Sequence, residues 1–302
     1  MPQISQPQLK GELYAISLTL IDGWFPILAL LSVQALGAIY TYFYSLTIAA
    51  MLLFFLLWQR KQLSELKRSA AYFNLFMVSL TITSLYILVF LSLKFTTPNH
   101  VALILFLQVL FAYLFFGRRQ EEQLNRVHLV GVILMTLGAV IVLFPKDFHL
   151  NIGDGLVLLA SLIAPFANHY QKQARKQVSP MSILFVRSLL ALPFLYLLAV
   201  WLEPQPALQL LWQQLPWLFL IGALAFVVGK ILWIEALHLL PITKVNALYA
   251  FAPIFTMLLS YWLLNQPPTL NQVLGALPIL IGSYFITRPQ TAKMPISTPN
   301  KE

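Results

Sequence analysis

The feature that most constrains this sequence is a series of apolar blocks, each about 20 residues long, that follow one another along most of the chain. A helix of about 20 apolar residues crosses the roughly 30 Å hydrocarbon core of a bilayer. The blocks are apolar on all faces and lack the alternation of a barrel strand. Only 10% of the residues are charged, against about 25% in soluble domains. The sequence therefore predicts an all-α integral membrane protein, because helices satisfy their own backbone in lipid.

Reading the apolar windows in order predicts ten transmembrane helices. They cover residues 11–33, 38–58, 72–93, 99–117, 127–145, 153–171, 181–202, 216–238, 242–264 and 270–288. Of 19 lysines and arginines, Arg187 and Lys230 fall deep inside these spans, Lys94 and Lys146 fall on one side, and the other 15, which include Lys244 and Arg288 at the ends of spans, fall on the side of the N-terminus. Basic residues accumulate on the cytoplasmic side of membrane proteins. We therefore expect a multi-pass protein of the cell (cytoplasmic or inner) membrane with both termini in the cytoplasm.

A shift of 144 residues superimposes the second half of the chain on the first without a gap. The shift pairs Gly131 with Gly275, Gly138 with Gly282, and Pro145 with Pro289. Each half holds five predicted helices, and an odd number means that the second half enters the membrane from the opposite face. Two inverted five-helix repeats can open a central site to either side in turn. The predicted organisation is a cytoplasmic tail at 1–10, a repeat at 11–145, a linker at 146–154, a repeat at 155–289 and a cytoplasmic tail at 290–302.

Several short motifs of the second half resemble the EamA-type transporters of the drug/metabolite transporter superfamily. They are Ala236-Leu237 before the turn at Pro241, Ala252-Pro253-Ile254-Phe255, Tyr261-Trp262, and the glycines between Gly275 and Gly282. Departures from the family pattern are Asn265-Gln266 in place of Gly-Glu and Val109 in place of a proline in the first half, whereas Glu122 stands at the expected glutamate position. The resemblance implies a secondary transporter that exports amino acids, related metabolites or drugs. It also implies a central cavity lined by helices 1, 3, 4, 6, 8 and 9.

Two ionisable side chains lie near the middle of predicted spans, Asp22 in the first and Lys230 in the eighth. A charge at the bilayer centre costs about 2.5–3.5 kcal/mol on insertion scales, so that each one requires a reason. In the arrangement implied by the family, both would line the same cavity. They could bind charged groups of a substrate or exchange a proton during the cycle. Alternatively, they form a static ion pair that joins two helices.

The repeat predicts a second polar patch, because Asn168 and His169 match Trp24 and Phe25 of the first half. Gln108 and Asn246 could contact a substrate or only bond across helices, and aromatic residues such as Trp24 and Tyr249 could stack on a ligand. The predicted substrate-binding residues are Asp22, Trp24, Gln108, Asn168, His169, Lys230, Asn246 and Tyr249. The predicted proton-coupling residues are Asp22, Lys230, Glu235 and His169.

Two further expectations concern residues without a predicted site role. Arg187 lies about a third of the way into its span, and we expect its long stem to reach the cytoplasmic interface. The pairs Gly131/Gly138 and Gly275/Gly282 are seven residues apart, which places each pair on one helix face and predicts close helix packing.

Sequence signatures of other functions are absent. The chain has no cysteine, no phosphate-binding loop of the Gly-x4-Gly-Lys type, no paired histidines of a metalloenzyme and no nucleophile elbow. We predict a non-enzymatic transporter with no cofactor and no metal. Its partners would be a small-molecule substrate and membrane lipids, with no nucleic acid, and a homodimer stays open. A flippase for a lipid-linked substrate is the first alternative, and a membrane-embedded lipid enzyme is the second.

Overall fold

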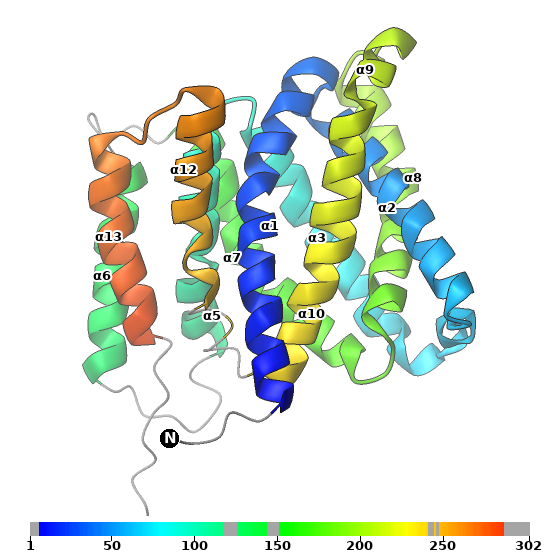
Figure 1. Cartoon of the computed structure of the whole chain (residues 1–302), viewed down its shortest axis with the longest axis horizontal. Helices are drawn as coiled ribbons and strands as arrows, with labels where there is room; N and C mark the ends of the chain where they lie inside the picture. The colour runs from blue at the N-terminus through cyan, green and yellow to red at the C-terminus, as the bar shows by residue number, and fades with distance from the viewer. Residues whose placement is uncertain (1–5, 117–125, 144–150, 241–244, 246–247, 287–302) are drawn as a thin grey trace, which may run out of the picture.

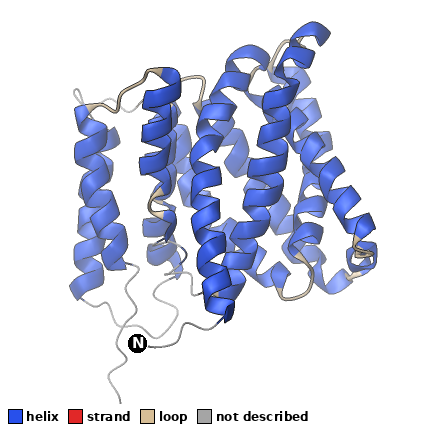
Figure 2. Ribbon diagram, viewed as in Figure 1, coloured by secondary structure: helices blue, strands red, loops and turns tan. Residues whose placement is uncertain are grey.

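The apolar blocks fold as helices in the computed structural model of the chain, which describes residues 6–116, 126–143, 151–240, 245 and 248–286. No strand occurs among these residues, and the helices stand roughly alongside one another in a bundle (Figures 1 and 2). The first half contains α1 (Gln6–Leu36), α2 (Ala38–Gln59), the short 3-10 helices η1 (Leu63–Lys67) and η2 (Ser69–Ala71), α3 (Tyr72–Ser92), α4 (Pro98–Phe106), α5 (Gln108–Phe116) and α6 (Arg126–Leu143). The second half contains α7 (Ile152–Arg175), α8 (Pro180–Leu202), α9 (Leu208–Leu220), the π-helix η4 (Ile221–Gly229), α10 (Lys230–Leu239), α12 (Ala252–Leu264) and α13 (Leu270–Ile286).

Seven helical stretches of 19 to 32 residues are long and apolar enough to cross a membrane. Three of them are composite, because η2 continues into α3, α4 into α5, and α9 through η4 into α10. Three shorter apolar helices, Val127–Leu143, Ala252–Leu264 and Leu270–Ile286, lie within the other three predicted spans. The chain is thus a helical multi-pass membrane protein, and the count of ten spans stays a prediction.

Helices that are equivalent under the 144-residue shift pack against each other. The α2 helix contacts α8 and α6 contacts α13, and α4 contacts α12 within the equivalent fourth and ninth predicted spans, while the contact of α3 with α7 is matched by that of α1 with α10. The α6–α13 pair stands at one end of the bundle (Figure 1). This pattern agrees with two repeats that are related by a pseudo-twofold axis.

The glycine pairs explain how closely α6 and α13 approach. A Cβ atom added to Gly138 would lie 2.5 Å from the carbonyl oxygen of Gly275, and one added to Gly131 would lie 2.7 Å from that of Gly282. The predicted close packing is therefore confirmed. Because the earlier glycine of one helix meets the later glycine of the other, the two helices run antiparallel, as equivalent helices of inverted repeats must.

A buried carboxylate joins the start of α2 to the end of α8. Glu203 is only 7% exposed, and it accepts hydrogen bonds from the backbone N–H groups of Ala38 (2.8 Å), Ile39 (2.9 Å) and Tyr40 (3.1 Å). Lys94 adds an ion pair at 2.9 Å. The first N–H groups of a helix have no hydrogen-bond partner within the helix, and here the Glu203 carboxylate accepts hydrogen bonds from three of them. Gly37 precedes them with a φ of 90°, and a side chain there would collide with Glu203.

A second carboxylate, Glu65 in η1, anchors the start of α8 at the opposite end of the bundle. It accepts hydrogen bonds from the Ser179 backbone (2.7 Å) and the Ser182 hydroxyl (2.8 Å). Burial raises the pKa of the Glu65 carboxyl, but these hydrogen bonds and the nearby Arg68 together bring it below its ordinary value.

The expectation that Arg187 reaches the membrane surface is wrong. Its side chain is 1% exposed, and its guanidinium lies over the rings of Tyr86 on α3 and Phe226 on η4, with 5.8 Å to each centroid. The backbone nearby is also enclosed, because the Ser79 hydroxyl of α3 donates to the Arg187 carbonyl. Arg187 thus lies on the face of α8 that packs inside the bundle, from which its stem cannot reach water.

We predict that Gly138→Leu destabilises the protein by about 1–3 kcal/mol or more, because the added side chain forces α6 and α13 apart. Leu137→Val is the matched control, since Leu137 is 53% exposed on the outer face of the same helix. Thermal unfolding of purified protein in detergent measures both. Equal melting temperatures for the two variants would contradict the packing described here.

Candidate functional site

Asp22 and Lys230 meet inside the bundle although 208 residues separate them in the chain. Lys230 Nζ lies 3.1 Å from Asp22 Oδ2, and the two side chains are 16% and 7% exposed. The Tyr249 hydroxyl donates to the same Oδ2 atom at 3.1 Å. Asp22 comes from the middle of α1, Lys230 begins α10 directly after η4, and Tyr249 precedes α12. The two repeats therefore contribute opposite charges to one contact.

Local sequence explains how α1 and α12 come close enough for this contact. A Cβ atom added to Gly23 would lie 2.5 Å from the Phe255 ring, so that only glycine allows α12 to approach here. The Thr256 hydroxyl of α12 donates to the Gly23 carbonyl at 3.1 Å. Pro26 follows inside α1, where it removes one backbone donor without ending the helix.

A cavity of about 40 Å³ adjoins the ion pair. This volume holds about one water molecule, because each water takes up about 30 Å³ in the liquid. Residues of α1, α3, α4, α5, α10 and α12 line it, and its polar lining residues are Asp22, Tyr86, Gln108, Lys230, Tyr249 and Thr256. These helices correspond to helices 1, 3, 4, 8 and 9 of the cavity that the family resemblance implies.

A second hydrogen-bonded chain extends the site toward α7, the sixth predicted span. The Asn168 amide donates to Gln108 Oε1 at 3.4 Å, and the Trp233 indole donates to Asn168 Oδ1 at 3.2 Å. The Trp233 ring also packs edge-on against Tyr249 at 5.4 Å between centroids. Gln108 and Asn168 therefore belong to the same polar region as Asp22, Lys230 and Tyr249.

The other predicted site residues lie elsewhere. Trp24 lines a separate apolar groove between α1 and η4. His169 is exposed, and its ring stacks on Phe116 at 5.3 Å. Glu235 forms an ion pair with Arg175 at 3.1 Å, at the end of α7. Asn246 lies outside the described residues.

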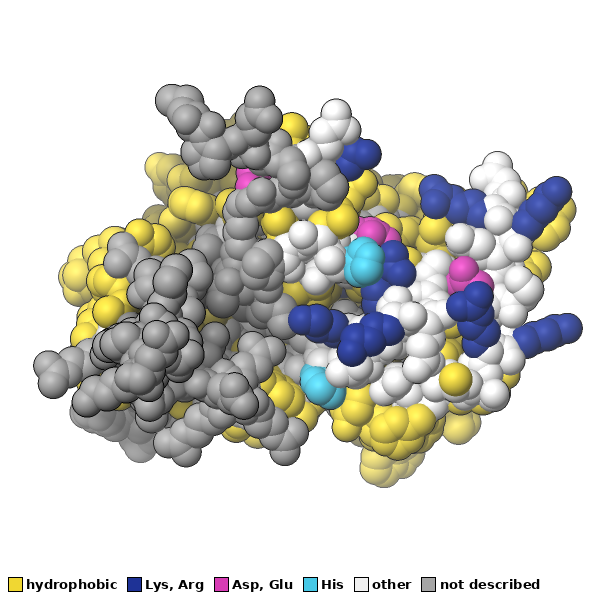
Figure 3. All heavy atoms as spheres, turned by 90° about the horizontal axis from the view of Figure 1, so that it is seen from below, with side chains coloured by type: hydrophobic (Ala, Val, Ile, Leu, Met, Phe, Trp, Pro, Cys, Tyr) yellow, Lys and Arg dark blue, Asp and Glu magenta, His cyan; other side chains and the backbone are white. Residues whose placement is uncertain are grey.

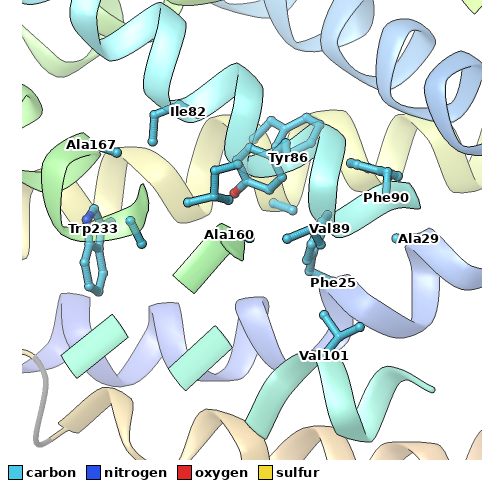
Figure 4. Packing of buried hydrophobic residues seen from close by; sticks show 14 of the residues in the cluster. Phe25, Ala29, Ile82, Tyr86, Val89, Phe90, Val101, Ala160, Ala167 and Trp233 are labelled. Carbon is cyan, nitrogen blue, oxygen red and sulfur yellow. The ribbon is translucent and has the colours of Figure 1, made fainter. Parts of the chain in front are cut away.

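Tyr86 is a cavity residue outside the predicted substrate-binding set, although it is one of the aromatic residues that the sequence offers as a wall for a ligand. It lines the cavity, and Figure 4 shows it at the centre of the buried aromatic cluster, with Phe25 and Phe90 beside it and Trp233 farther along. The repeat contains a signal for it, because Tyr86 lies 144 residues before Lys230 and is its counterpart in the first half. Both members of this equivalent pair face one cavity.

The described residues contain no group of three or more His, Asp or Glu side chains that could hold a metal ion. The arrangement provides one carboxylate, one ammonium, two phenols, one hydroxyl and one carboxamide around a small cavity, and the carboxamide of Asn168 is hydrogen-bonded to the one that lines it. Such a set can bind a small polar molecule by ion pairs and hydrogen bonds.

The profile of the EamA-like transporter family matches residues 9–144 and 151–288. These two matches cover most of the chain, and the chain belongs to this family, which is part of the drug/metabolite transporter superfamily. Membership supports a membrane transporter function.

Two curated relatives are similar over long stretches. An uncharacterized transporter, sll1164, of Synechocystis sp. is 26% identical over 223 residues, which are 68% of this chain and 63% of that protein. The match thus spans less than two thirds of the length of the Synechocystis protein. An uncharacterized transporter, YoaV, of Bacillus subtilis is 22% identical over 92% of this chain and 97% of its own. One solved crystal structure aligns with a TM-score of 0.68 at 17% identity, over 91% of this chain and 95% of its own, and this likeness shows the fold.

We predict that Asp22→Asn and Lys230→Met each destabilise the protein by about 3–5 kcal/mol, because each leaves one buried charge unpaired. The double variant should recover most of this loss, since neither charge remains. A double-mutant cycle of thermal unfolding in detergent measures the interaction. Additive losses in the double variant would show that the two groups do not form a buried pair.

Proposed function

We propose that this chain is a secondary transporter that moves a small polar molecule across the cell membrane by alternating access. The observation that carries the proposal is the Asp22–Lys230 pair with Tyr249 at a cavity inside the bundle. Asp22 belongs to the first repeat and Lys230 to the second, so that a movement of one repeat against the other must change this contact. The chain then binds its substrate where the two repeats meet.

The size of the cavity supports a cycle with large conformational changes. Binding sites for small molecules usually measure about 300–1,000 Å³, whereas this cavity measures about 40 Å³. A metabolite therefore requires the repeats to separate on one side before it enters. The small cavity agrees with a compact conformation between an outward-open and an inward-open form.

Proton coupling at Asp22 provides a driving force for the cycle. A proton on Asp22 neutralises the carboxylate and breaks the ion pair, and this frees Lys230 from α1 and lets the repeats move apart. Of the four predicted proton carriers, Asp22 and Lys230 line the cavity, whereas Glu235 pairs with Arg175 and His169 is exposed. We therefore assign the coupling to Asp22 and Lys230.

We further propose export from the cytoplasm, with both termini cytoplasmic and without enzymatic activity. Lys and Arg side chains gather over the face seen from below in Figure 3, which is the end of the bundle where the chain begins in Figure 1. An excess of basic residues favours the cytoplasmic side. A small-molecule substrate and surrounding lipids are the proposed partners.

One observation favours a second candidate, a flippase for a lipid-linked substrate. An apolar groove of about 180 Å³ lies between α1 and η4, lined by Leu20, Ile21, Trp24, Leu28, Leu224 and Ala225. Ile21 is the neighbour of Asp22, and Leu20 is 48% exposed. An acyl chain in this groove would place its polar headgroup beside the ion pair. Transport of a water-soluble molecule by purified protein in liposomes would argue against this candidate.

Cysteine accessibility tests alternating access directly, because the chain has no cysteine of its own. We predict that single cysteines at Gln108 and Asn168 react with impermeant maleimides from either side of the membrane, depending on the conformation, and that a transported ligand shifts the balance. Ser64→Cys is the control, since Ser64 is exposed in the η1 connection and should react from one side only. Labelling of positions 108 and 168 from a single side under all conditions would contradict alternating access.

We predict that Asp22→Asn abolishes proton flux driven by substrate while the protein still inserts and folds. The assay uses proteoliposomes loaded with pyranine and a panel of amino acids and organic acids as substrates. Glu235→Gln is the comparison, and it should keep the flux because its carboxylate lies away from the cavity. Full flux in Asp22→Asn would remove Asp22 from the coupling mechanism.

A further inference from the structure

Arg187 is a buried cation whose charge is not compensated within the described residues. Its side chain is 1% exposed, and none of its three guanidinium nitrogens has a hydrogen-bond partner among those residues. The contacts to the Tyr86 and Phe226 rings offset part of the cost as cation–π interactions. They satisfy none of its five N–H donors.

Other cations inside or at the edge of the bundle have a carboxylate partner. Lys230 pairs with Asp22, Lys94 with Glu203, and Arg175 with Glu235. Arginine cannot shed its proton to avoid the cost of burial. An unpaired buried charge costs several kcal/mol, and a protein that retains one gains from a ligand that neutralises it.

Two further polar groups without partners lie in the same region. The hydroxyls of Tyr42 on α2 and Thr83 on α3 are buried and interact only weakly with each other, and neither forms a hydrogen bond of ordinary geometry with a described residue. Tyr42 lies within electrostatic range of Arg187 and next to Thr83. Its ring packs on Tyr86 and Phe226, at 5.6 Å from each, and these are the two rings beneath the guanidinium. Most buried polar groups in folded proteins are hydrogen-bonded, so that three such groups together indicate a missing ligand.

We infer that Arg187, Tyr42 and Thr83 form an anion subsite that binds the carboxylate of the transported molecule. A guanidinium donates two parallel hydrogen bonds to a carboxylate, and each hydroxyl can donate one more. The cluster holds a single positive charge, which matches a monoanion better than a phosphate dianion. This inference rests on the proposed transport function and specifies its substrate class, a small carboxylic acid or an amino acid-like zwitterion.

Tyr86 joins the subsite to the cavity at Asp22. Its ring lies under the Arg187 guanidinium, and the same residue lines the cavity beside Lys230. The other ring, Phe226, belongs to η4, and this π-helix leads directly into Lys230. π-Helical segments are frequent at functional sites. A displacement of η4 would move Phe226 from Arg187 and open a path between the two polar regions.

The alternative is that Arg187 only has a structural role and stabilises the bundle by packing against the two aromatic rings. The two accounts differ in the effect of removing the charge. A purely structural Arg187 stabilises the empty protein, so that its loss lowers the melting temperature. A subsite for an absent anion destabilises the empty protein, so that Arg187→Met should keep or raise the melting temperature.

The test is the thermal stability of purified protein in detergent with sodium acetate, propionate or benzoate, at constant ionic strength against chloride. Because a ligand that binds only the folded state stabilises it, at least one carboxylate should raise the melting temperature of the wild type. Phosphate should not. The rise should vanish in Arg187→Met and persist in part in Arg187→Lys, measured against each variant's own temperature in chloride.

Lys94→Met is the matched control, because it removes a cation that is already paired. It should lower the melting temperature and keep the response to carboxylate. Overturning results are the absence of a carboxylate response in the wild type, a larger response to phosphate, or an unchanged response in Arg187→Met. A carboxylate response that depends on Arg187 without transport in liposomes would keep the subsite and refute the transporter. Transport that is unaffected by Arg187→Met would keep the transporter and refute the subsite.

Discussion

A charge inside a lipid-embedded bundle must find an opposite charge, and the Asp22–Lys230 pair shows how this requirement organises the protein. The two residues lie on α1 and α10, in different repeats, and their 3.1 Å contact holds the repeats together where the cavity lies. Replacing such a pair with apolar residues often costs nothing, so that stability alone does not explain its presence. What a pair of this kind adds is a contact that one proton can break, and the carboxylate that would take the proton lines the cavity.

The scaffold around this pair is symmetric, whereas its chemistry is not. Equivalent helices pack on each other across the pseudo-twofold axis, and the glycines of α6 and α13 meet in reciprocal order. At the site, however, Lys230 has Tyr86 as its counterpart, and Asp22 has Phe166, which is 42% exposed. In the proposed transport cycle, such a symmetric frame allows two exchanged conformations of similar energy. In the same proposal, the asymmetric polar residues provide one site for a polar molecule instead of two competing ones.

Much of the fold follows from the sequence because hydrophobic length determines which segments cross the membrane, and glycine spacing determines which helices approach closely. The depth of Asp22 and Lys230 was equally readable, and both line one cavity. Hydropathy gives depth but not the direction in which a side chain points around its helix. At about 100° per residue, Trp24 points away from Asp22 into the groove with Leu224, and His169 points away from Asn168 toward Phe116. The expectation for Arg187 was wrong for the same reason. A snorkelling side chain requires a lipid-facing position, whereas Arg187 lies on the face of α8 that packs inside the bundle.

The charges of the Asp22–Lys230 pair and of Arg187 can be considered together, because the two polar regions adjoin each other. The Asp22–Lys230 pair is neutral, so that the unpaired Arg187 leaves this part of the bundle with one net positive charge. A bound carboxylate cancels that charge, whereas a proton on Asp22 adds one. The two binding events therefore favour each other electrostatically across Tyr86, which borders both sites, and such coupling is reciprocal by thermodynamic necessity. On these proposals the uncompensated arginine is what makes the proton and the substrate depend on each other.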